Sequence, residues 1–243
     1  MKPTAAFVVP CLNEEANVAA LVDELHAVAA RPDLPATIAG IYVVDNGSTD
    51  ATAARATAAG ATVVSQPERG YGRACLAGAR AAGDVDLLVF LDGDRSDRPD
   101  DLPLLLAPIV AGEADLVLGS RALGSFEPGS LTIPQRAGNW LATRLLRVLY
   151  GVRLTDVGPF RVVPRCELLA LGMAEPTYGW PVEMIARACR RGLRVREVPV
   201  TWRRRAGGRS KVSGDVRAST RAGIRILVTI VRSRRGPTLR GTA

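Results

Sequence analysis

The chain has 243 residues, 47% hydrophobic and 23% charged, so it can bury one sizeable core and lies near the upper limit for a single domain. Its four cysteines are far apart and show no C-x-x-C spacing, which argues against a zinc site and a disulfide framework and fits free thiols in a reducing cytosol. The net charge of +8 is concentrated in residues 194–243, where 14 Arg or Lys residues face 2 acidic ones, whereas residues 1–193 carry 18 against 22.

The first half of the chain alternates short apolar runs with longer segments of helical length. Five runs rich in Leu or β-branched residues, without strict alternation, are typical of buried parallel strands. They occupy residues 5–9, 38–44, 61–64, 86–91 and 115–118. Helices are expected between them, at residues 15–30, 50–59, 71–82 and 100–110. The alternation predicts an α/β fold with a mostly parallel sheet flanked by helices.

The second half is less regular. Residues 123–132 are rich in Gly, Pro and Ser and predict a loop, and residues 135–150 predict a helix. A strand is expected at 157–163, a helix at 181–191 and a last strand at 193–202. We divide the chain into a catalytic domain at residues 1–205, a mobile, basic, Gly-rich loop at 206–214 and a helical tail at 215–243.

Residues 215–235 repeat arginine at helical spacing, with apolar residues on another side. The two sets are Arg217, Arg221, Arg225 and Arg232, and Val216, Ile224, Leu227 and Val231. The pattern predicts a basic amphipathic helix. Two positions are open to it: it lies in a membrane interface, or it packs its apolar side on the protein's own core.

We expect neither a signal peptide nor a membrane span. The apolar stretch at residues 5–9 is short and runs directly into Pro10 and two glutamates. The longest late apolar run, residues 224–231, is interrupted by Arg225 and falls short of the ~20 residues that a bilayer requires.

Polar residues follow the ends of four expected strands, where ligands of open α/β sheets collect. The segments are Pro10–Glu15, Asp45–Asp50, Asp92-Gly93-Asp94 and Gly119-Ser120-Arg121. Two carboxylates separated by one small residue can hold Mg²⁺ or Mn²⁺ on a diphosphate. Paired acids at a turn also serve as helix caps, but the position of Asp92 and Asp94 directly after an apolar run favours the metal.

Together these segments resemble the family 2 glycosyltransferases of GT-A fold. Three further motifs are similar to the branch that contains dolichyl-phosphate mannosyltransferases and polyprenyl-phosphate glucosyltransferases. They are Arg136-x-x-Asn139, Thr155-Asp156-x-Gly158-Pro159-Phe160-Arg161 and Gly208-Arg209-Ser210-Lys211. The resemblance covers roughly residues 5–214.

The resemblance implies roles for individual residues. Those expected at the nucleotide are Pro10, Asn13, Glu14, Asp45 and Asp92. Asp92 and Asp94 would hold the metal, with Asp94 counted as catalytic, and the expected phosphate ligands are Arg121, Arg136, Arg209 and Lys211. Arginine suits phosphate because its planar fork binds bidentately.

The chain departs from the family pattern at three positions. Leu12 replaces an aromatic residue, Asn46 replaces a second acid, and Ser96 replaces a glutamine. The donor, UDP-glucose or GDP-mannose, therefore stays open.

Family membership implies inversion by a single displacement, with the metal neutralising charge on the leaving group. A phosphate acceptor is already anionic and needs no general base. A hydroxyl acceptor does need one, and Glu183 is then the best catalytic candidate. The alternative for Glu183 is a structural residue that orients an arginine or caps the helix that begins near Pro181.

We expect a hexosyltransferase that acts on a polyprenyl phosphate and sits peripherally at the cytoplasmic face of the cell membrane. A family 2 enzyme with a soluble hydroxyl acceptor is the first alternative. A sugar-phosphate nucleotidyltransferase is disfavoured because residues 10–14 lack its Gly-rich, Arg-containing loop. A nucleic-acid binder is disfavoured because aromatics are only 5% of residues and Trp202 alone lies near the arginine block.

Overall fold

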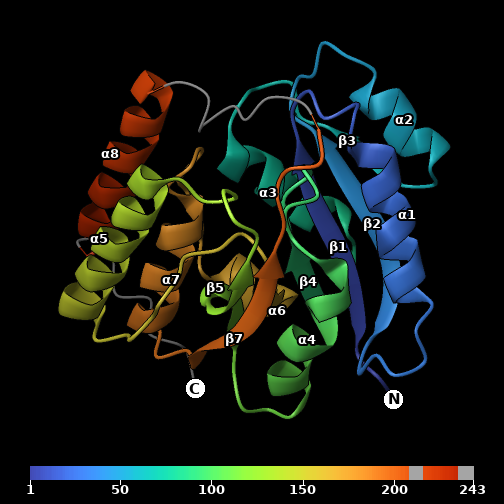
Figure 1. Ribbon diagram of the computed structural model, residues 1–243. Coiled ribbons are helices and arrows are strands. Elements are labelled where there is room, and N and C mark those ends of the chain that lie inside the picture. Colours follow the sequence, from blue (N-terminus) through green and yellow to red (C-terminus); the bar gives the residue numbers. More distant parts are fainter. Residues whose placement is uncertain (208–215, 235–243) are drawn as a thin grey trace.

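The computed structural model of the protein describes residues 1–207 and 216–234. A seven-stranded sheet lies between two layers of helices (Figure 1). The strands are β1 (Thr4–Cys11), β2 (Thr37–Asp45), β3 (Thr62–Ser65), β4 (Leu87–Phe90), β5 (Leu116–Phe126), β6 (Arg161–Pro164) and β7 (Val195–Trp202). The helices are α1 (Val18–Ala29), α2 (Thr52–Ala58), α3 (Tyr71–Ala81), η1 (Pro99–Asp101), α4 (Leu102–Val110), α5 (Ile133–Tyr150), α6 (Arg165–Ala170), α7 (Trp180–Arg190) and α8 (Val216–Arg232).

The strand order β3-β2-β1-β4-β6-β5-β7 confirms the predicted α/β fold with a mostly parallel sheet. Of the described strands, only β6 runs antiparallel to its neighbours, β4 and β5. The chain winds from β1 to β2 on one side, whereas β4 pairs with β1 on the other. Open sheets form a ligand crevice at the carboxyl ends of the strands where the winding reverses, so the ends of β1 and β4 mark the candidate site.

Both faces of the sheet are buried, which explains why the strands lack strict alternation of polar and apolar residues. Along β1, Phe7 and Val9 join one hydrophobic cluster with α1, α2 and α4. Ala6 and Val8 point to the other face and join a second cluster with α3, α5, α6, α7 and α8. The core is therefore two apolar layers, one on each face of the sheet.

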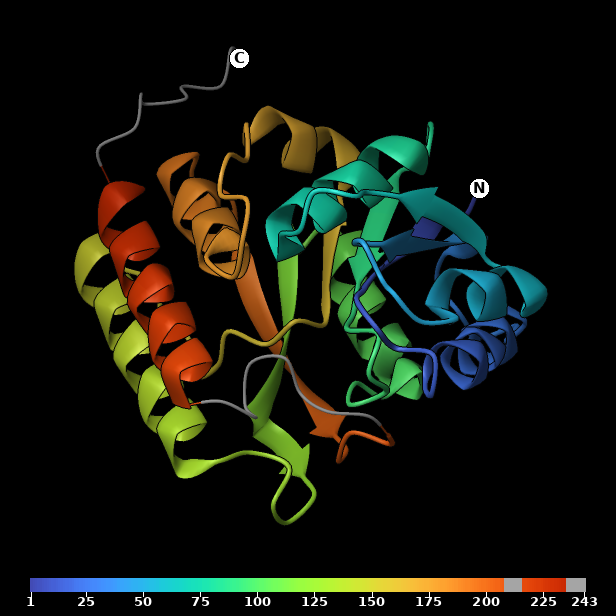
Figure 2. The same ribbon diagram turned by 90° about the horizontal axis from the view of Figure 1, so that it is seen from above.

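Helix α8 is part of the second layer and packs beside α5 and α7 (Figures 1 and 2). Its Ala222 and Ile230 are buried, and the Tyr150 hydroxyl donates to the Ile230 carbonyl at 2.5 Å. Arg225 pairs with Glu175 at 2.9 Å. One side of the predicted amphipathic helix therefore packs on the protein's own core. No helix in the described ranges has the length and apolar character needed to cross a membrane.

Three local differences separate the sequence prediction from the structure. Strand β5 continues to Phe126, into the expected loop, because pairing with β7 resumes at Ser125 after a register shift. Strand β6 begins only at Arg161, and the short helix α6 was not predicted. Residues 208–214 of the expected mobile loop lie outside the described residues.

Candidate active site

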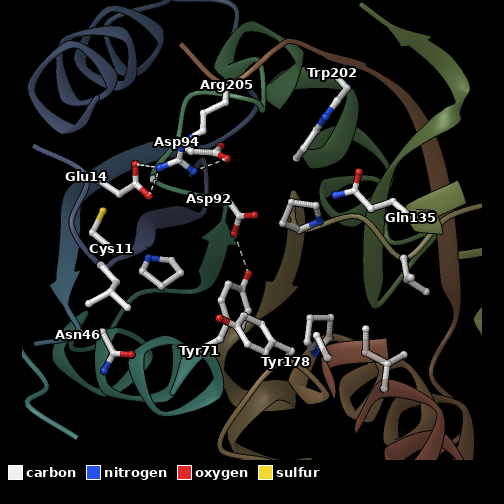
Figure 3. Close-up of a pocket in the computed structure, with 18 of the residues that line it drawn as sticks. Cys11, Glu14, Asn46, Tyr71, Asp92, Asp94, Gln135, Tyr178, Trp202 and Arg205 are labelled. Atoms are coloured by element: carbon white, nitrogen blue, oxygen red, sulfur yellow. Dashed lines mark hydrogen bonds and ion pairs between the residues drawn. The ribbon is translucent and has the colours of Figure 1, made fainter. Parts of the chain in front are cut away.

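A cavity of about 360 Å³ opens beside the carboxyl ends of β1 and β4 (Figure 3). Residues at the end of β1 and directly after β1 and β2 line one part of it: Pro10, Cys11, Leu12, Glu14 and Asn46. The aspartates after β4 lie in the middle. The second half of the chain contributes the polar side chains of Arg121, Gln135 and Arg205 and a set of mainly apolar residues: Val157, Pro159, Tyr178, Pro181, Trp202, Ala222 and Ile226. The site thus joins a polar part at the strand ends to an apolar part that includes α8.

Asp92 and Asp94 both line the cavity. The Tyr71 hydroxyl donates to Asp92 Oδ1 at 3.1 Å, and the Asp92 amide donates to the buried Asp97 carboxylate at 3.0 Å. Burial, and then the charge of Asp94, raises the pKa of Asp92 to about 7. A cation beside these carboxylates would favour their charged forms.

The residue between them must be small. A Cβ on Gly93 would lie 2.4 Å from Cys11 Sγ and 3.3 Å from the Pro10 carbonyl oxygen. This close approach lets the turn after β4 pack against the end of β1 and so holds Asp92 and Asp94 at the cavity.

The donor set fits a hard divalent cation that is shared with a ligand. Within the described part of the chain, no group of three or more His, Cys, Asp or Glu side chains is placed to hold a metal. Asp92 and Asp94 would supply two carboxylates and leave the other positions to phosphate oxygens and water. Mg²⁺ is characteristically bound in this way, through one or two carboxylates and substrate phosphates.

Arg205 lies between Glu14 and Asp94, a position that the sequence analysis did not anticipate (Figure 3). Its guanidinium donates to both Glu14 carboxylate oxygens and to Asp94 Oδ2, the latter at 3.1 Å. Asn17 also donates to Glu14 at 2.8 Å, and Arg205 Nε donates to the Gly207 carbonyl at 2.7 Å. The only available signal was a run of three arginines directly after the last strand.

Two residues expected at the nucleotide shape the adjacent loop and are not among the described residues that line the cavity. Asn13 has a φ of 52° and accepts from the Thr49 amide at 2.8 Å. Asp45 accepts from the Ser48 amide at 3.1 Å. Asn46 does line the cavity, but its amide donates to the carbonyls of residues 66 and 68, so it anchors that loop.

The two described arginines expected at the acceptor phosphate have different surroundings. Arg121 lines the cavity, donates to both Asp156 oxygens at 2.6 Å and lies 4.8 Å from the Trp202 ring centroid. Arg136 is exposed near the start of α5, 5.9 Å from the Phe126 ring centroid, and is absent from the lining. Arg209 and Lys211 lie outside the described residues.

Glu183 is buried on α7 and is not among the described residues that line the cavity. Its carboxylate accepts from the Ala174 and Glu175 amides and from Arg187 Nε, the last at 2.8 Å. This geometry supports the structural alternative, in which Glu183 orients an arginine and fixes a loop.

The fold matches that of GT-A structures, and the paired aspartates lie at the carboxyl end of a central strand. The model of glycosyl transferase family 2 matches residues 6–166, and the chain belongs to this family. An uncharacterized glycosyltransferase of Mycobacterium tuberculosis is 40% identical over 214 residues, which cover 87% of this chain and 91% of the relative. The polyprenol monophosphomannose synthase of Mycolicibacterium smegmatis is 31% identical over 242 residues, which cover 88% and 84%.

Solved structures give the same classification. Glucosyl-3-phosphoglycerate synthase from Mycobacterium tuberculosis, in complex with Mn²⁺, uridine diphosphate and glucosyl-3-phosphoglycerate, aligns with a TM-score of 0.75 at 25% identity. The alignment covers 97% of this chain and 81% of that one. The relatives therefore include a synthase named for a polyprenol-linked product and one named for a soluble product.

Proposed function

We propose that this chain transfers a hexose from UDP-glucose or GDP-mannose to a polyprenyl phosphate, with inversion, in the presence of Mg²⁺ or Mn²⁺. The observation that carries the proposal is the apolar part of the cavity beyond the paired aspartates. Val157, Pro159, Pro181, Ala222 and Ile226 contribute to it. Such a surface suits an isoprenoid chain next to its phosphate better than it suits a small hydrophilic acceptor. Similarity to a polyprenol monophosphomannose synthase supports the same assignment.

The chain's own residues would act mainly by binding and orientation. Asp92 and Asp94 would hold the metal, whose chemistry is to neutralise the charge that develops on the departing nucleoside diphosphate. Arg121, fixed by Asp156, would orient the acceptor phosphate, which is already anionic and needs no general base. Arg136, Arg209 and Lys211 remain proposed phosphate contacts, and Pro10 and Glu14 proposed nucleotide contacts.

A partition assay tests the reaction. Radiolabelled UDP-glucose and GDP-mannose are incubated with undecaprenyl phosphate and Mn²⁺, with and without excess chelator, and extracted with organic solvent. We expect label from one donor in the organic phase, and its loss with chelator. Label that stays in the aqueous phase as a new product would instead assign a soluble acceptor.

A soluble acceptor is the second candidate, because the chain aligns over 97% of its length with glucosyl-3-phosphoglycerate synthase. Incubation with 3-phosphoglycerate in place of the lipid tests it directly. Product formation from 3-phosphoglycerate alone would replace the lipid proposal.

A further inference from the structure

Helices α5 and α8 lie side by side at the edge of the molecule, on the opposite layer from α4 (Figure 2). Large apolar residues, of types that are otherwise buried in the core, are exposed on these two helices. We call this surface the α5–α8 face and define it by Ile133, Trp140, Leu141, Val148, Ile224 and Val231. Trp140 is 60% exposed and Ile224 is 58% exposed. The face therefore holds six of the thirteen exposed large hydrophobic residues of the described chain.

Positive charge predominates on the two helices of this face, although Arg225 of α8 is paired with Glu175. Neither α5 nor α8 contains an aspartate or a glutamate, whereas α5 carries three arginines and α8 carries four. Arg144 lies 5.5 Å from the Trp140 ring centroid, so cationic and apolar groups meet on one surface. Aromatic and apolar residues bordered by arginine are characteristic of helices that lie in the interface of an anionic bilayer.

Two depressions border the exposed residues of α5. A cleft of about 400 Å³ lies between α5 and α8, and it is lined by five apolar residues, Leu141, Leu145, Leu227, Val228 and Val231, together with Arg232. A basic depression of about 480 Å³ lies on the other side of α5, between Trp140 and three arginines: Arg144, Arg147 and Arg153. One has the chemistry to receive acyl chains and the other to receive phosphate headgroups.

From these contacts we infer that the α5–α8 face docks on an anionic phospholipid membrane. A second copy of the chain fits less well, because a two-fold interface would set these arginines against their own equivalents. An anionic membrane offers negatively charged headgroups to the arginines and an apolar interior to the exposed apolar side chains.

The docked position has a consequence for the cavity. Ala222 and Ile226 of α8 line the cavity, while Ile224 and Val231 belong to the α5–α8 face. Helix α8 thus separates the membrane surface from the active site by its own width. Docking would bring the cavity close to a lipid acceptor, and this advantage for transfer rests on the proposed polyprenyl phosphate acceptor. The inference that the face binds a membrane does not depend on that acceptor.

Flotation of the full chain with vesicles tests the inference without donor or acceptor. Vesicles of phosphatidylcholine with phosphatidylglycerol are compared with phosphatidylcholine alone, at low and at high salt. The variants are Trp140→Glu and Ile224→Glu, and the control is Leu104→Glu, which changes a similarly exposed residue on α4. Melting temperatures establish that each variant is folded.

We expect the wild-type chain and Leu104→Glu to float with anionic vesicles at low salt and to be released at high salt. Trp140→Glu and Ile224→Glu should bind about tenfold more weakly or worse, because each puts a carboxylate into an apolar, anionic interface. No binding by the wild type, or equal binding by all variants, would overturn the inference. A wild-type dimer that Trp140→Glu dissociates would also overturn it and assign the face to a second copy.

Transfer assays separate this inference from the proposed function. With a short, water-soluble prenyl phosphate, Trp140→Glu should transfer as well as wild type, whereas transfer to undecaprenyl phosphate in anionic vesicles should fall about tenfold. Equal activity of wild type and Trp140→Glu on the vesicle acceptor would contradict docking through this face. If no prenyl phosphate is glycosylated but vesicle binding follows the expected pattern, the acceptor proposal fails and the docking surface stands.

Discussion

At the scale of single residues, Arg205 places a positive charge between two acidic groups of the cavity. It pairs with Glu14, whose side chain is only 8% exposed, and with Asp94 at 3.1 Å. In this conformation the guanidinium therefore neutralises Asp94, a carboxylate that we propose for the metal. Binding of a metal with a diphosphate would compete with that contact, and Arg205 would then be free to meet the diphosphate.

We predict that Arg205→Ala lowers the free energy of unfolding by about 1–3 kcal/mol. Breaking a buried ion pair leaves a charge uncompensated, but here Arg205 is 18% exposed and Glu14 keeps its bond from Asn17, so the cost stays below that of a fully buried pair. Urea denaturation measures the change. The double variant Arg205→Ala/Glu14→Gln, which also removes the charge of Glu14, should recover part of the loss. A double variant less stable than the single one would contradict this account.

We predict that Asp94→Asn lowers transfer by about 10²–10³-fold, because the loss of one preorganised charge from a polar active site has this effect on rate. The fold should persist, since the asparagine carbonyl can still accept from the Ser96 amide, which donates to Asp94 at 3.0 Å. Initial rates and melting temperature are compared with Asp84→Asn, a control at a fully exposed carboxylate. Full activity of Asp94→Asn, or of the wild type in excess chelator, would exclude the metal role.

Residue placement shows what sequence motifs can and cannot specify. Glu14, Asp92 and Arg121 line the cavity. Glu14 and Asp92 lie within three residues of the ends of β1 and β4, and Arg121 lies inside β5, at its register shift. Asn13 follows the same strand as Glu14, but its left-handed backbone turns its side chain to the loop after β2. Arg205 could not be placed, because its contacts bridge 191 and 111 residues of chain and leave no local pattern.

At the scale of elements, α8 has two different sides. Ile230 is fully buried against the second apolar layer, whereas Ile224, fewer than two turns earlier, is 58% exposed. The same residue type on one helix therefore allows a matched comparison of packing with surface exposure.

We predict that Ile230→Ala lowers the free energy of unfolding by about 2–4 kcal/mol, because it removes buried methyl groups and leaves a cavity. Ile224→Ala should change it by less than about 0.5 kcal/mol. Urea unfolding of the two variants measures the difference. Equal values would mean that α8 does not pack on the core in solution.

The sequence predicted the elements of the first half better than those of the second. The runs that form β1, β2 and β4 are apolar because helices cover both faces of the sheet. This apolar character can be recognised from each run alone. The extension of β5 depends on pairing with β7, about 75 residues later, and β6 enters between β4 and β5 only after the long helix α5. Such non-local pairings leave no periodicity in the sequence.

At the scale of the whole molecule, the sheet brings the polar loops after β1, β2 and β4 to one cavity, and the second half of the chain completes it. Charge follows this division, since residues 1–193 are net acidic and residues 194–243 strongly basic. Arg205, from the basic part, already contacts the acidic part. The cavity therefore lies where the two parts meet, and a metal with a nucleoside diphosphate should stabilise the whole fold.

We predict that UDP or GDP with Mn²⁺ raises the melting temperature, and that the nucleotide without metal does so much less. A ligand at 100 times its Kd adds about 2.7 kcal/mol to the stability of the folded state. For a domain of this size, 1 kcal/mol corresponds to roughly 2–4 °C, so a shift of about 5–10 °C is expected.

Differential scanning fluorimetry with uridine, guanosine and adenosine diphosphates measures the shift in melting temperature. The nucleotide that gives the largest shift identifies the base of the donor. Asp94→Asn should lose the metal-dependent part, while Asp84→Asn should retain it. Because Asp92 and Asp94 can contribute only two metal ligands, Mn²⁺ alone should bind weakly and stabilise little. A large shift with Mn²⁺ alone, or an equal shift with nucleotide in chelator, would mean that the metal and the diphosphate do not share the site at Asp92 and Asp94.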